Sequence, residues 1–204
     1  MSKKLIIIGC GGHAKVVADI AVKSGYQIEG FLDDYPSEDT FIGFPVLGKV
    51  KDAAIYSSYN FFIAIGNTKV RREIYCSLIQ QNLKLVSLIH PAAVIASDVK
   101  IGVGSVVMAG VVVNSEAEIG QGCILNTCSS VDHDCLIEDF AHISVGAHVA
   151  GTVKIGKNTW IGAGATVSNN IDIVDDCIIG AGAVVVKDIA ESGTYVGAPA
   201  KKIK

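Results

Sequence analysis

A six-residue repeat constrains the fold of this chain more than any other feature of its sequence. Every sixth residue of the repeat is branched and aliphatic, at Ile89, Ile95, Ile101, Val107, Val113, Ile119, Leu125, Val131, Ile137, Ile143, Val149, Ile155, Ile161, Val167, Ile173, Ile179 and Val185. A period of six fits neither an α-helix nor an alternating strand, but it fits a short strand followed by a turn. The repeat therefore predicts a parallel β-helix, in which three hexads form one triangular coil and successive coils bury the aliphatic residues.

A small residue stands two positions before most of these aliphatic residues. Three of the six cysteines, Cys123, Cys135 and Cys177, occupy this small position, where a compact apolar side chain is expected. No CxxC pair occurs in the chain, and the other three cysteines are scattered singly. We therefore expect free thiols in a reducing compartment, with no disulfide and no metal site.

The N-terminal part has the pattern of a nucleotide-binding unit. Its elements are predicted as a buried strand, a glycine-rich loop, a helix, a second strand and an acidic pair, at residues 4–8, 9–14, 14–24, 28–32 and 33–34. In such a unit the glycines let a phosphate approach backbone N–H groups at the start of the helix, and the acidic residue meets a ribose or base. The alternative is a tight strand-to-helix turn followed by a surface Asp pair.

The remaining N-terminal residues limit the size of this unit. After a polar loop through about residue 58, we expect a strand at 61–65, a helix at 68–80 opened by Asn67, and a last strand at 84–89. Lys69, Arg71 and Arg72 at the start of the helix are expected to form a solvated face; the alternative is a contact with the phosphate. Only one mononucleotide-binding half fits before the repeats begin. The predicted domains are a Rossmann-like α/β half domain at 1–88, binding a nucleotide-sugar, and an all-β parallel β-helix at 89–204.

Composition and charge narrow the partners and the location. A net charge of -3 gives no reason to expect a nucleic acid or an anionic membrane as partner. No apolar run approaches the ~18 residues of a membrane span. The apolar run near the N-terminus is shorter than the roughly 7 residues that a signal peptide needs. These features favour a cytoplasmic protein.

Six segments carry a family resemblance: GCGGHAKVV, FLDD, FFIAIGN, LNTCSSVDHD, HISVGAHVAG and GTYVGAPAKK. Together they resemble the bacterial sugar acetyltransferases typified by the UDP-4-amino-sugar N-acetyltransferase of bacillosamine synthesis and by sialic acid O-acetyltransferase. The resemblance covers nearly the whole chain. It implies a small Rossmann-like domain followed by a left-handed parallel β-helix of hexapeptide repeats, a trimeric assembly, and transfer of an acetyl group from acetyl-CoA to a sugar.

His133 is the leading candidate for a catalytic base. It lies between Asp132 and Asp134, and a carboxylate on the far ring nitrogen would fix its tautomer and raise its basicity. The alternative is a surface histidine with incidental acidic neighbours. The resemblance implies that His133 is the general base and Asp134 its partner. The family partner is Glu, so the choice between Asp134 and Asp132 stays open at this point.

The resemblance also implies two groups of binding residues. The residues matched to acetyl-CoA are His142, Gly151, Ala163 and Ala181, with the Gly151 backbone N–H facing the thioester carbonyl. The residues matched to the substrate are Gly11, Gly12, His13, Asp33, Asp34, Gly66 and Asn126. Ala163 and Ala181 are 18 residues apart, one full coil, so we expect them to stack on the same edge; each is equally explained as a small residue in a tight corner.

The expected function is acetyl-CoA-dependent N-acetylation of the 4-amino group of a nucleotide-linked sugar, of the UDP-4-amino-4,6-dideoxy type. The transfer is expected to be direct, with no acyl-enzyme and no metal. His133 and His142 are half a coil apart, so they lie on opposite sides of one prism, and a joint role requires a homotrimer with sites between subunits. Two alternatives stay open: O-acetylation of sialic acid or another sugar, and a non-catalytic nucleotide-sugar-binding scaffold.

Overall fold

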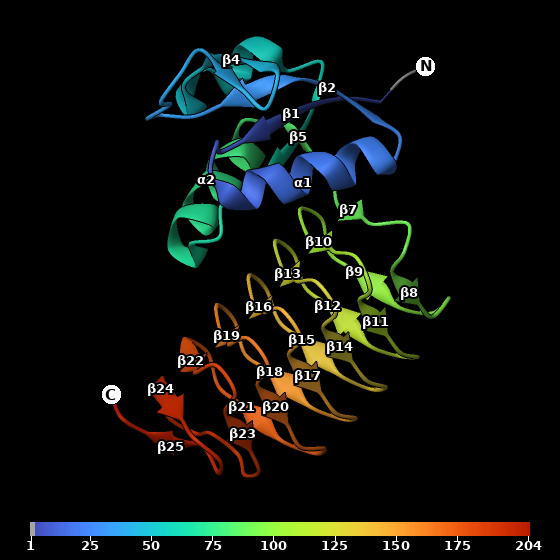
Figure 1. Ribbon diagram of the computed structural model, residues 1–204, viewed down its shortest axis with the longest axis vertical. Helices are drawn as coiled ribbons and strands as arrows, with labels where there is room; N and C mark the ends of the chain where they lie inside the picture. Colours follow the sequence, from blue (N-terminus) through green and yellow to red (C-terminus); the bar gives the residue numbers. More distant parts are fainter. Residues whose placement is uncertain (1–2) are drawn as a thin grey trace. The chain divides into compact units, whose positions relative to one another are not determined.

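The computed structural model describes residues 3–204, which form two compact units (Figure 1). Unit 1 ends at Pro91, and unit 2 spans Ala92–Lys204. The first predicted domain begins at residue 1, and residues 1 and 2 lie outside the described range. An α/β unit followed by a β-helix confirms the predicted fold class.

Unit 1 is built on one twisted sheet with the strand order β3-β4-β2-β1-β5-β6. Its elements are β1 (Lys3–Ile8), α1 (Gly12–Lys23), β2 (Tyr26–Leu32), β3 (Thr40–Phe41), β4 (Phe44–Gly48), the 3-10 helix η1 (Val50–Tyr56), β5 (Asn60–Ile63), α2 (Thr68–Gln80), β6 (Lys84–Leu85) and β7 (Leu88–Ile89). The strands pair in parallel except β3 with β4. All four residues from Leu5 to Ile8 are buried, as a central parallel strand requires.

The turn after β1 depends on a glycine. Helix α2 begins and ends at the predicted residues, whereas α1 begins at Gly12, two residues before the predicted start, and ends at Lys23. Gly9 has φ +105°, and a Cβ there would lie 3.0 Å from the Ile65 side chain, so only glycine fits without strain. The side chain of Asn67 accepts a hydrogen bond from the Val70 backbone N–H and caps α2. Gly25, with φ +81°, follows the end of α1.

The segment predicted as a polar loop contains regular structure. Strands β3 and β4 form an antiparallel hairpin within it, and η1 follows. The hairpin is anchored by aromatic contacts: the ring of Phe31 lies 5.0 Å from that of Phe41 and 6.2 Å from that of Phe44, measured between centroids. Sequence periodicity missed it because β3 has only two residues. The expected strand at 84–89 is likewise divided into β6 and β7.

Arg71 corrects the expectation of a solvated basic face at the start of α2. Lys69 and Arg72 are exposed, but Arg71 is only 1% exposed. Its Nη1 donates hydrogen bonds to the carbonyl oxygens of Ile65 and Gly66, at 3.1 and 2.8 Å. These bonds to the loop between β5 and α2 compensate part of the cost of burying the charge. The guanidinium therefore holds that loop in place.

Unit 2 is the predicted β-helix, in which short strands, most of them two residues long, stack in three ladders (Figure 1). The strands pair in parallel except the last two of the chain, which are antiparallel. The first ladder is β8 (Val94–Ile95), β11 (Val112–Val113), β14 (Ser130–Val131), β17 (His148–Val149), β20 (Thr166–Val167) and β23 (Val184–Val185). The second is β9 (Lys100–Ile101), β12 (Glu118–Ile119), β15 (Leu136–Ile137), β18 (Lys154–Ile155) and β21 (Asp172–Ile173). The third contains β10 (Val106–Val107), β13 (Ile124–Leu125), β16 (His142–Ile143), β19 (Trp160–Ile161), β22 (Cys177–Ile179), β24 (Gly193–Val196) and β25 (Lys201–Lys202).

The register between paired strands of the coils is 18 residues, as in the pairing of Val113 with Val131. The aliphatic hexad positions from Val107 to Val185 are buried and form the core. Ile89 departs from this pattern: it lies in unit 1 and is 40% exposed, because it precedes the first coil. Ile95 and Ile101, in that first coil, are half-buried.

Each corner between ladders is a tight turn, and many of these turns use a residue in the left-handed region. At the corner between the first and second ladders these residues include Asp134, Thr152 and Asn170, with φ of 57°, 59° and 57°. Asp and Asn tolerate this conformation better than most residues. No helix within residues 3–204 is long and apolar enough to cross a membrane.

Candidate active site

His133 and Asp134 form a hydrogen-bonded pair at the corner between β14 and β15. Nδ1 of His133 lies 2.6 Å from Oδ2 of Asp134, whose left-handed backbone turns its side chain back toward the ring. A carboxylate only accepts, so Nδ1 carries the proton and Nε2 has the free lone pair. This hydrogen bond is the main cause that raises the pKa of His133 above its ordinary value of 6.5.

Asp132, the other candidate partner of His133, bonds to the main chain and not to the ring. Its Oδ1 accepts the His133 backbone N–H at 2.8 Å and the Asn114 side-chain amide at 2.7 Å. The Asn114 bond is the main cause that lowers the pKa of Asp132. Asp132 therefore fixes the main chain at the corner, whereas Asp134 fixes the ring.

Gly151 lies one coil after His133, directly beside the edge of the imidazole that carries Nε2. A Cβ at residue 151 would lie 2.6 Å from His133 Nε2, so a side chain and the ring cannot both keep this arrangement. Within residues 3–204, the Gly151 backbone N–H donates to no acceptor. At the corner one coil earlier, Asp132 accepts the equivalent N–H of His133, but Ala150 offers no such oxygen. The corner thus presents a ring nitrogen with a free lone pair and a backbone N–H donor together.

A groove of about 480 Å³ follows the third ladder and the turns beyond its strands. Its walls include four predicted residues, Asn126, His142, Ala163 and Ala181. The Gly182 backbone N–H donates to the Ala163 carbonyl oxygen at 2.8 Å, which stacks the two turns one coil apart. The small residues in these turns keep that edge of the groove open.

The wall of the groove also contains residues that sequence reasoning missed. Trp160 stacks on His142 with ring centroids 5.6 Å apart and planes inclined by 2°. Its Nε1–H donates to Oγ of Ser144. Ile178 continues the same row from β22. The available signal was Trp160 itself, the one tryptophan of the chain, which stands at an outward position one coil after His142 and is 47% exposed.

His133 and this groove lie on different sides of the β-helix. The His133 turn joins the first ladder to the second, whereas the groove runs along the third ladder. In a triangular coil, a corner faces away from the side opposite to it. The structure therefore brings His133, Asp134 and Gly151 together, and separately Asn126, His142, Ala163 and Ala181.

In unit 1, the acidic pair after β2 binds backbone N–H groups. Asp33 accepts the N–H of Cys10 at 2.7 Å and that of Tyr35 at 2.8 Å, and Asp34 accepts the N–H of Val50 at 3.0 Å. The two carboxylates thus hold the glycine loop and the neighbouring loops in shape. Around Gly11, Gly12 and Gly66, a Cβ would meet no heavy atom within 4 Å, so the space beside these glycines is open.

His13, at the start of α1, is the unusual polar group of this loop. Burial, followed by the charge of Arg71, lowers its pKa to about 4, so the ring is neutral near pH 7. Its Nε2 is buried and has no hydrogen-bond partner among residues 3–204. A buried polar atom without a partner is rare and marks a site that a ligand can complete.

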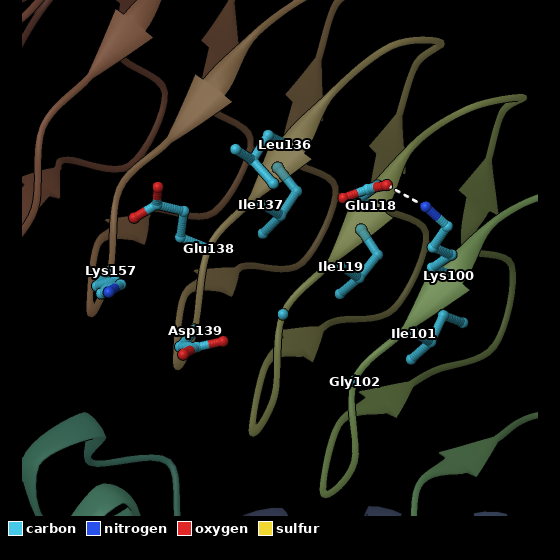
Figure 2. Close-up of a pocket in the computed structure, with 11 residues that line it drawn as sticks. Lys100, Ile101, Gly102, Glu118, Ile119, Leu136, Ile137, Glu138, Asp139 and Lys157 are labelled. Atoms are coloured by element: carbon cyan, nitrogen blue, oxygen red, sulfur yellow. Dashed lines mark hydrogen bonds and ion pairs between the residues drawn. The ribbon is translucent and has the colours of Figure 1, made fainter.

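A second cavity, of about 400 Å³, lies over the second ladder and contains none of the predicted site residues. Figure 2 shows its charged rim, where Lys100 is paired with Glu118 across adjacent strands. Glu138, on the same rim, is paired with Lys154. Such exposed pairs are typical of a solvated sheet face. No three His, Cys, Asp or Glu residues of the described chain are grouped so that they could hold a metal ion.

Comparison with known proteins identifies both parts of the chain. Residues 4–78 match the family described as the PglD N-terminal domain, and residues 152–187 match the bacterial transferase hexapeptide (six repeats). The chain is 33% identical over 113 residues to the UDP-N-acetylbacillosamine N-acetyltransferase of Bacillus subtilis, covering 52% of each protein. The matches with curated relatives span 21% to 63% of those proteins' own lengths.

Solved structures match nearly the whole chain. The acetyltransferase domain of PglB from Neisseria gonorrhoeae, in complex with acetyl coenzyme A, is 40% identical, covers 100% of both chains and has a TM-score of 0.94. PerB from Caulobacter crescentus, in complex with CoA and GDP-perosamine, is 35% identical, covers 98% of this chain and 97% of its own, and has a TM-score of 0.94. The resemblance in the sequence is thereby confirmed, and this chain belongs to the hexapeptide-repeat acetyltransferases that carry a PglD-type N-terminal domain.

Proposed function

We propose that this chain transfers the acetyl group of acetyl-CoA to the amino group of a nucleotide-linked amino sugar, of the UDP-4-amino-4,6-dideoxy type. The observation that carries the proposal is the His133–Asp134 pair beside the Gly151 backbone N–H. A base and an oxyanion donor at one corner are the two groups that amide formation from a thioester needs. The name of the PerB complex, with GDP-perosamine, supports a nucleotide-linked amino sugar, and the name of the B. subtilis relative supports the UDP linkage.

The proposed reaction is a direct transfer. Nε2 of His133 takes a proton from the sugar amine as the nitrogen attacks the thioester carbonyl carbon. The carbonyl oxygen becomes an oxyanion and accepts the Gly151 backbone N–H. The C–S bond then breaks, and the departing CoA thiolate takes the proton from the His133 imidazolium. Asp134 keeps the proton on Nδ1 throughout, so that Nε2 is the only ring nitrogen that exchanges it.

Two binding regions are proposed for the two substrates. The groove beside His142, Ala163 and Ala181 is wide and largely apolar along its edge, which suits the pantetheine arm of acetyl-CoA. The glycine loop suits the nucleotide-sugar, because the space beside its glycines is open and the unpartnered His13 Nε2 offers a hydrogen bond.

The proposed working unit is a homotrimer with its sites between subunits. His133 and the groove face away from each other on one β-helix, so one chain alone does not bring the base to a thioester lying in its own groove. Threefold packing of parallel prisms would set the His133 corner of one subunit against the groove of the next.

A thiol-release assay tests the activity. Acetyl-CoA is offered with UDP-linked and GDP-linked 4-amino sugars, with the matching 4-hydroxy sugars and with free sialic acid. We expect CoA release with an amino sugar, and an acetamide product by mass spectrometry. Release with a hydroxy sugar or sialic acid alone would replace N-acetylation by O-acetylation. A chain that binds a nucleotide-sugar and releases CoA with none of them would be a scaffold.

A further inference from the structure

One hydrogen bond at a wall of the groove determines how the Asn126 side chain is turned. The backbone N–H of Thr127 donates to Oδ1 of Asn126 at 2.8 Å. A backbone N–H can only donate, so the Asn126 atom that faces it must be the carbonyl oxygen. The amide NH₂ group then faces the other way. The main chain therefore distinguishes the oxygen from the nitrogen, two atoms that are otherwise hard to tell apart.

The orientation of Asn126 in turn determines the protonation of His142. Nδ2 of Asn126 lies 3.2 Å from Nε2 of His142. An amide NH₂ group donates and does not accept, so Nε2 must be the unprotonated nitrogen of the ring. The proton of the neutral imidazole is then on Nδ1.

Trp160 and Ser144 hold the plane of the same ring. The indole and the imidazole are almost parallel, inclined by 2°, and the indole is fixed by its hydrogen bond to Ser144, a residue only 5% exposed. Stacking alone would allow the imidazole to rotate by half a turn about its Cβ–Cγ bond, which exchanges its two edges. The Asn126 amide selects the edge, because only Nε2 can accept its hydrogen.

We infer that Asn126 is a positioning residue that holds His142 as the neutral tautomer protonated on Nδ1. His142 then lines the groove beside the acyl-CoA as a neutral ring whose Nε2 lone pair accepts the Asn126 amide, and not as a second base. The identity of this ligand rests on the proposed function, whereas the tautomer rests on the two hydrogen bonds alone. Asn126 acts on the donor ligand through His142 and not on the sugar amine.

Nuclear magnetic resonance of the ligand-free protein tests the tautomer. In long-range ¹H–¹⁵N spectra at mildly alkaline pH, we expect His142 to show a protonated Nδ1 and an unprotonated Nε2. Asn126→Asp keeps the side-chain shape but places a carboxylate against Nε2, so the proton should move to Nε2. Asn126→Ala removes the selection and should give a mixture of both tautomers. Asn126→Ala also tests the inference if Asn126→Asp does not fold.

The matched control is Ser130→Ala, which removes the hydroxyl 2.8 Å from Nδ1 of His148. It should change the His148 signals and leave those of His142 as they are. A wild-type His142 protonated on Nε2, or a His142 spectrum that neither Asn126 variant changes, would overturn the inference.

Steady-state kinetics separate positioning from substrate contact. Asn126→Asp should raise KM for acetyl-CoA about five- to tenfold, the effect of one misplaced hydrogen bond, and leave KM for the sugar near its wild-type value. A rise in KM for the sugar alone would make Asn126 a substrate contact and overturn the inference. If the wild type has no acetyltransferase activity, the proposed function fails while the spectra still decide the tautomer.

Discussion

At the scale of single residues, the His133 corner shows how a solvent-exposed imidazole can be made a better base. The ring is not buried, so desolvation opposes the shift only in part, and the hydrogen bond from Nδ1 to Asp134 raises its pKa. A base must be unprotonated to act. The rate should therefore fall as the pH drops through the raised pKa of His133.

Asp134→Asn tests this relation through the pH profile of kcat/KM. The variant removes the carboxylate that raises the His133 pKa, so that pKa should fall and the acid limb of the profile should move to lower pH. The plateau at higher pH should also fall, because an amide does not hold the ring tautomer as a carboxylate does.

Asp132→Asn is the matched control for this prediction. Asp132 bonds to the His133 main chain and affects the ring only through its charge. The acid limb of the kcat/KM profile should therefore move less in Asp132→Asn than in Asp134→Asn. An acid limb that stays in place or moves to higher pH in Asp134→Asn would contradict the role given to Asp134.

At the scale of elements, the stacking of the coils explains why the residue beside the His133 ring, Gly151, is a glycine. Residues one coil apart occupy the same corner, so the imidazole covers the position where a side chain of residue 151 would stand. The close approach is set by sterics and not by backbone strain, because Gly151 is not among the residues with positive φ.

Gly151→Ala should therefore displace the His133 ring and lower kcat by about two orders of magnitude, the usual effect of losing a general base. The structure of the coil should survive, with a small loss in Tm. A double-mutant cycle with His133→Ala supplies the control: once the imidazole is absent, the added Cβ has room and should cost neither stability nor further activity. Equal losses from Gly151→Ala in both backgrounds would show that the clash with His133 is not the cause.

Gly12→Ala tests the start of α1 as a ligand-binding element. Gly12 is the first residue of the helix and its Cβ would meet no protein atom, so alanine should leave the fold intact and add up to about 1 kcal/mol of helix stability. KM for the nucleotide-sugar should rise roughly tenfold, equivalent to ~1.4 kcal/mol, because the methyl group occupies space offered to the ligand.

Gly25→Ala is the contrasting variant for Gly12→Ala. With φ +81° at this position, it should lower Tm without a selective effect on KM for the nucleotide-sugar. A Gly12→Ala enzyme in which KM for acetyl-CoA rises instead would reverse the assignment of ligands to the two units.

The sequence was most informative where contacts recur every 18 residues. The hexads predicted the core, the ladders and the stacking of Ala163 on Ala181, and the same arithmetic pairs His133 with Gly151. Several contacts that do not follow the repeat were missed. Arg71 looks like its exposed neighbours Lys69 and Arg72 until the loop that it binds is folded.

The hydrogen bond between Asn126 and His142 was also not predictable from the sequence. Asn126 and His142 are 16 residues apart, so no 18-residue rule connects them, and their contact depends on the Thr127 backbone N–H turning the amide. The hairpin of β3 and β4 was missed because it depends on ring contacts of Phe41 and Phe44 with Phe31, which lies outside the hairpin.

At the scale of the whole molecule, the separation of His133 from the groove predicts complementation between subunits. His133→Ala and His142→Ala should each be nearly inactive on their own. When the two variants are unfolded together and reassembled, some interfaces pair an intact His133 with an intact His142, and activity should return. Each variant refolded alone is the control. Verified mixed oligomers that stay inactive, or a monomer with full activity by sedimentation, would rule out shared sites.

The 18-residue register has a consequence for insertions and deletions in unit 2. Removing one full coil, such as residues 164–181, would bring the downstream part closer by one strand spacing, about 4.8 Å, and return every later residue to its original side. Removing only six residues would rotate the downstream part by one side of the triangle, so that the segment continuing the groove would leave the third ladder. The length of the groove can therefore change only in whole coils, each a step of fixed height.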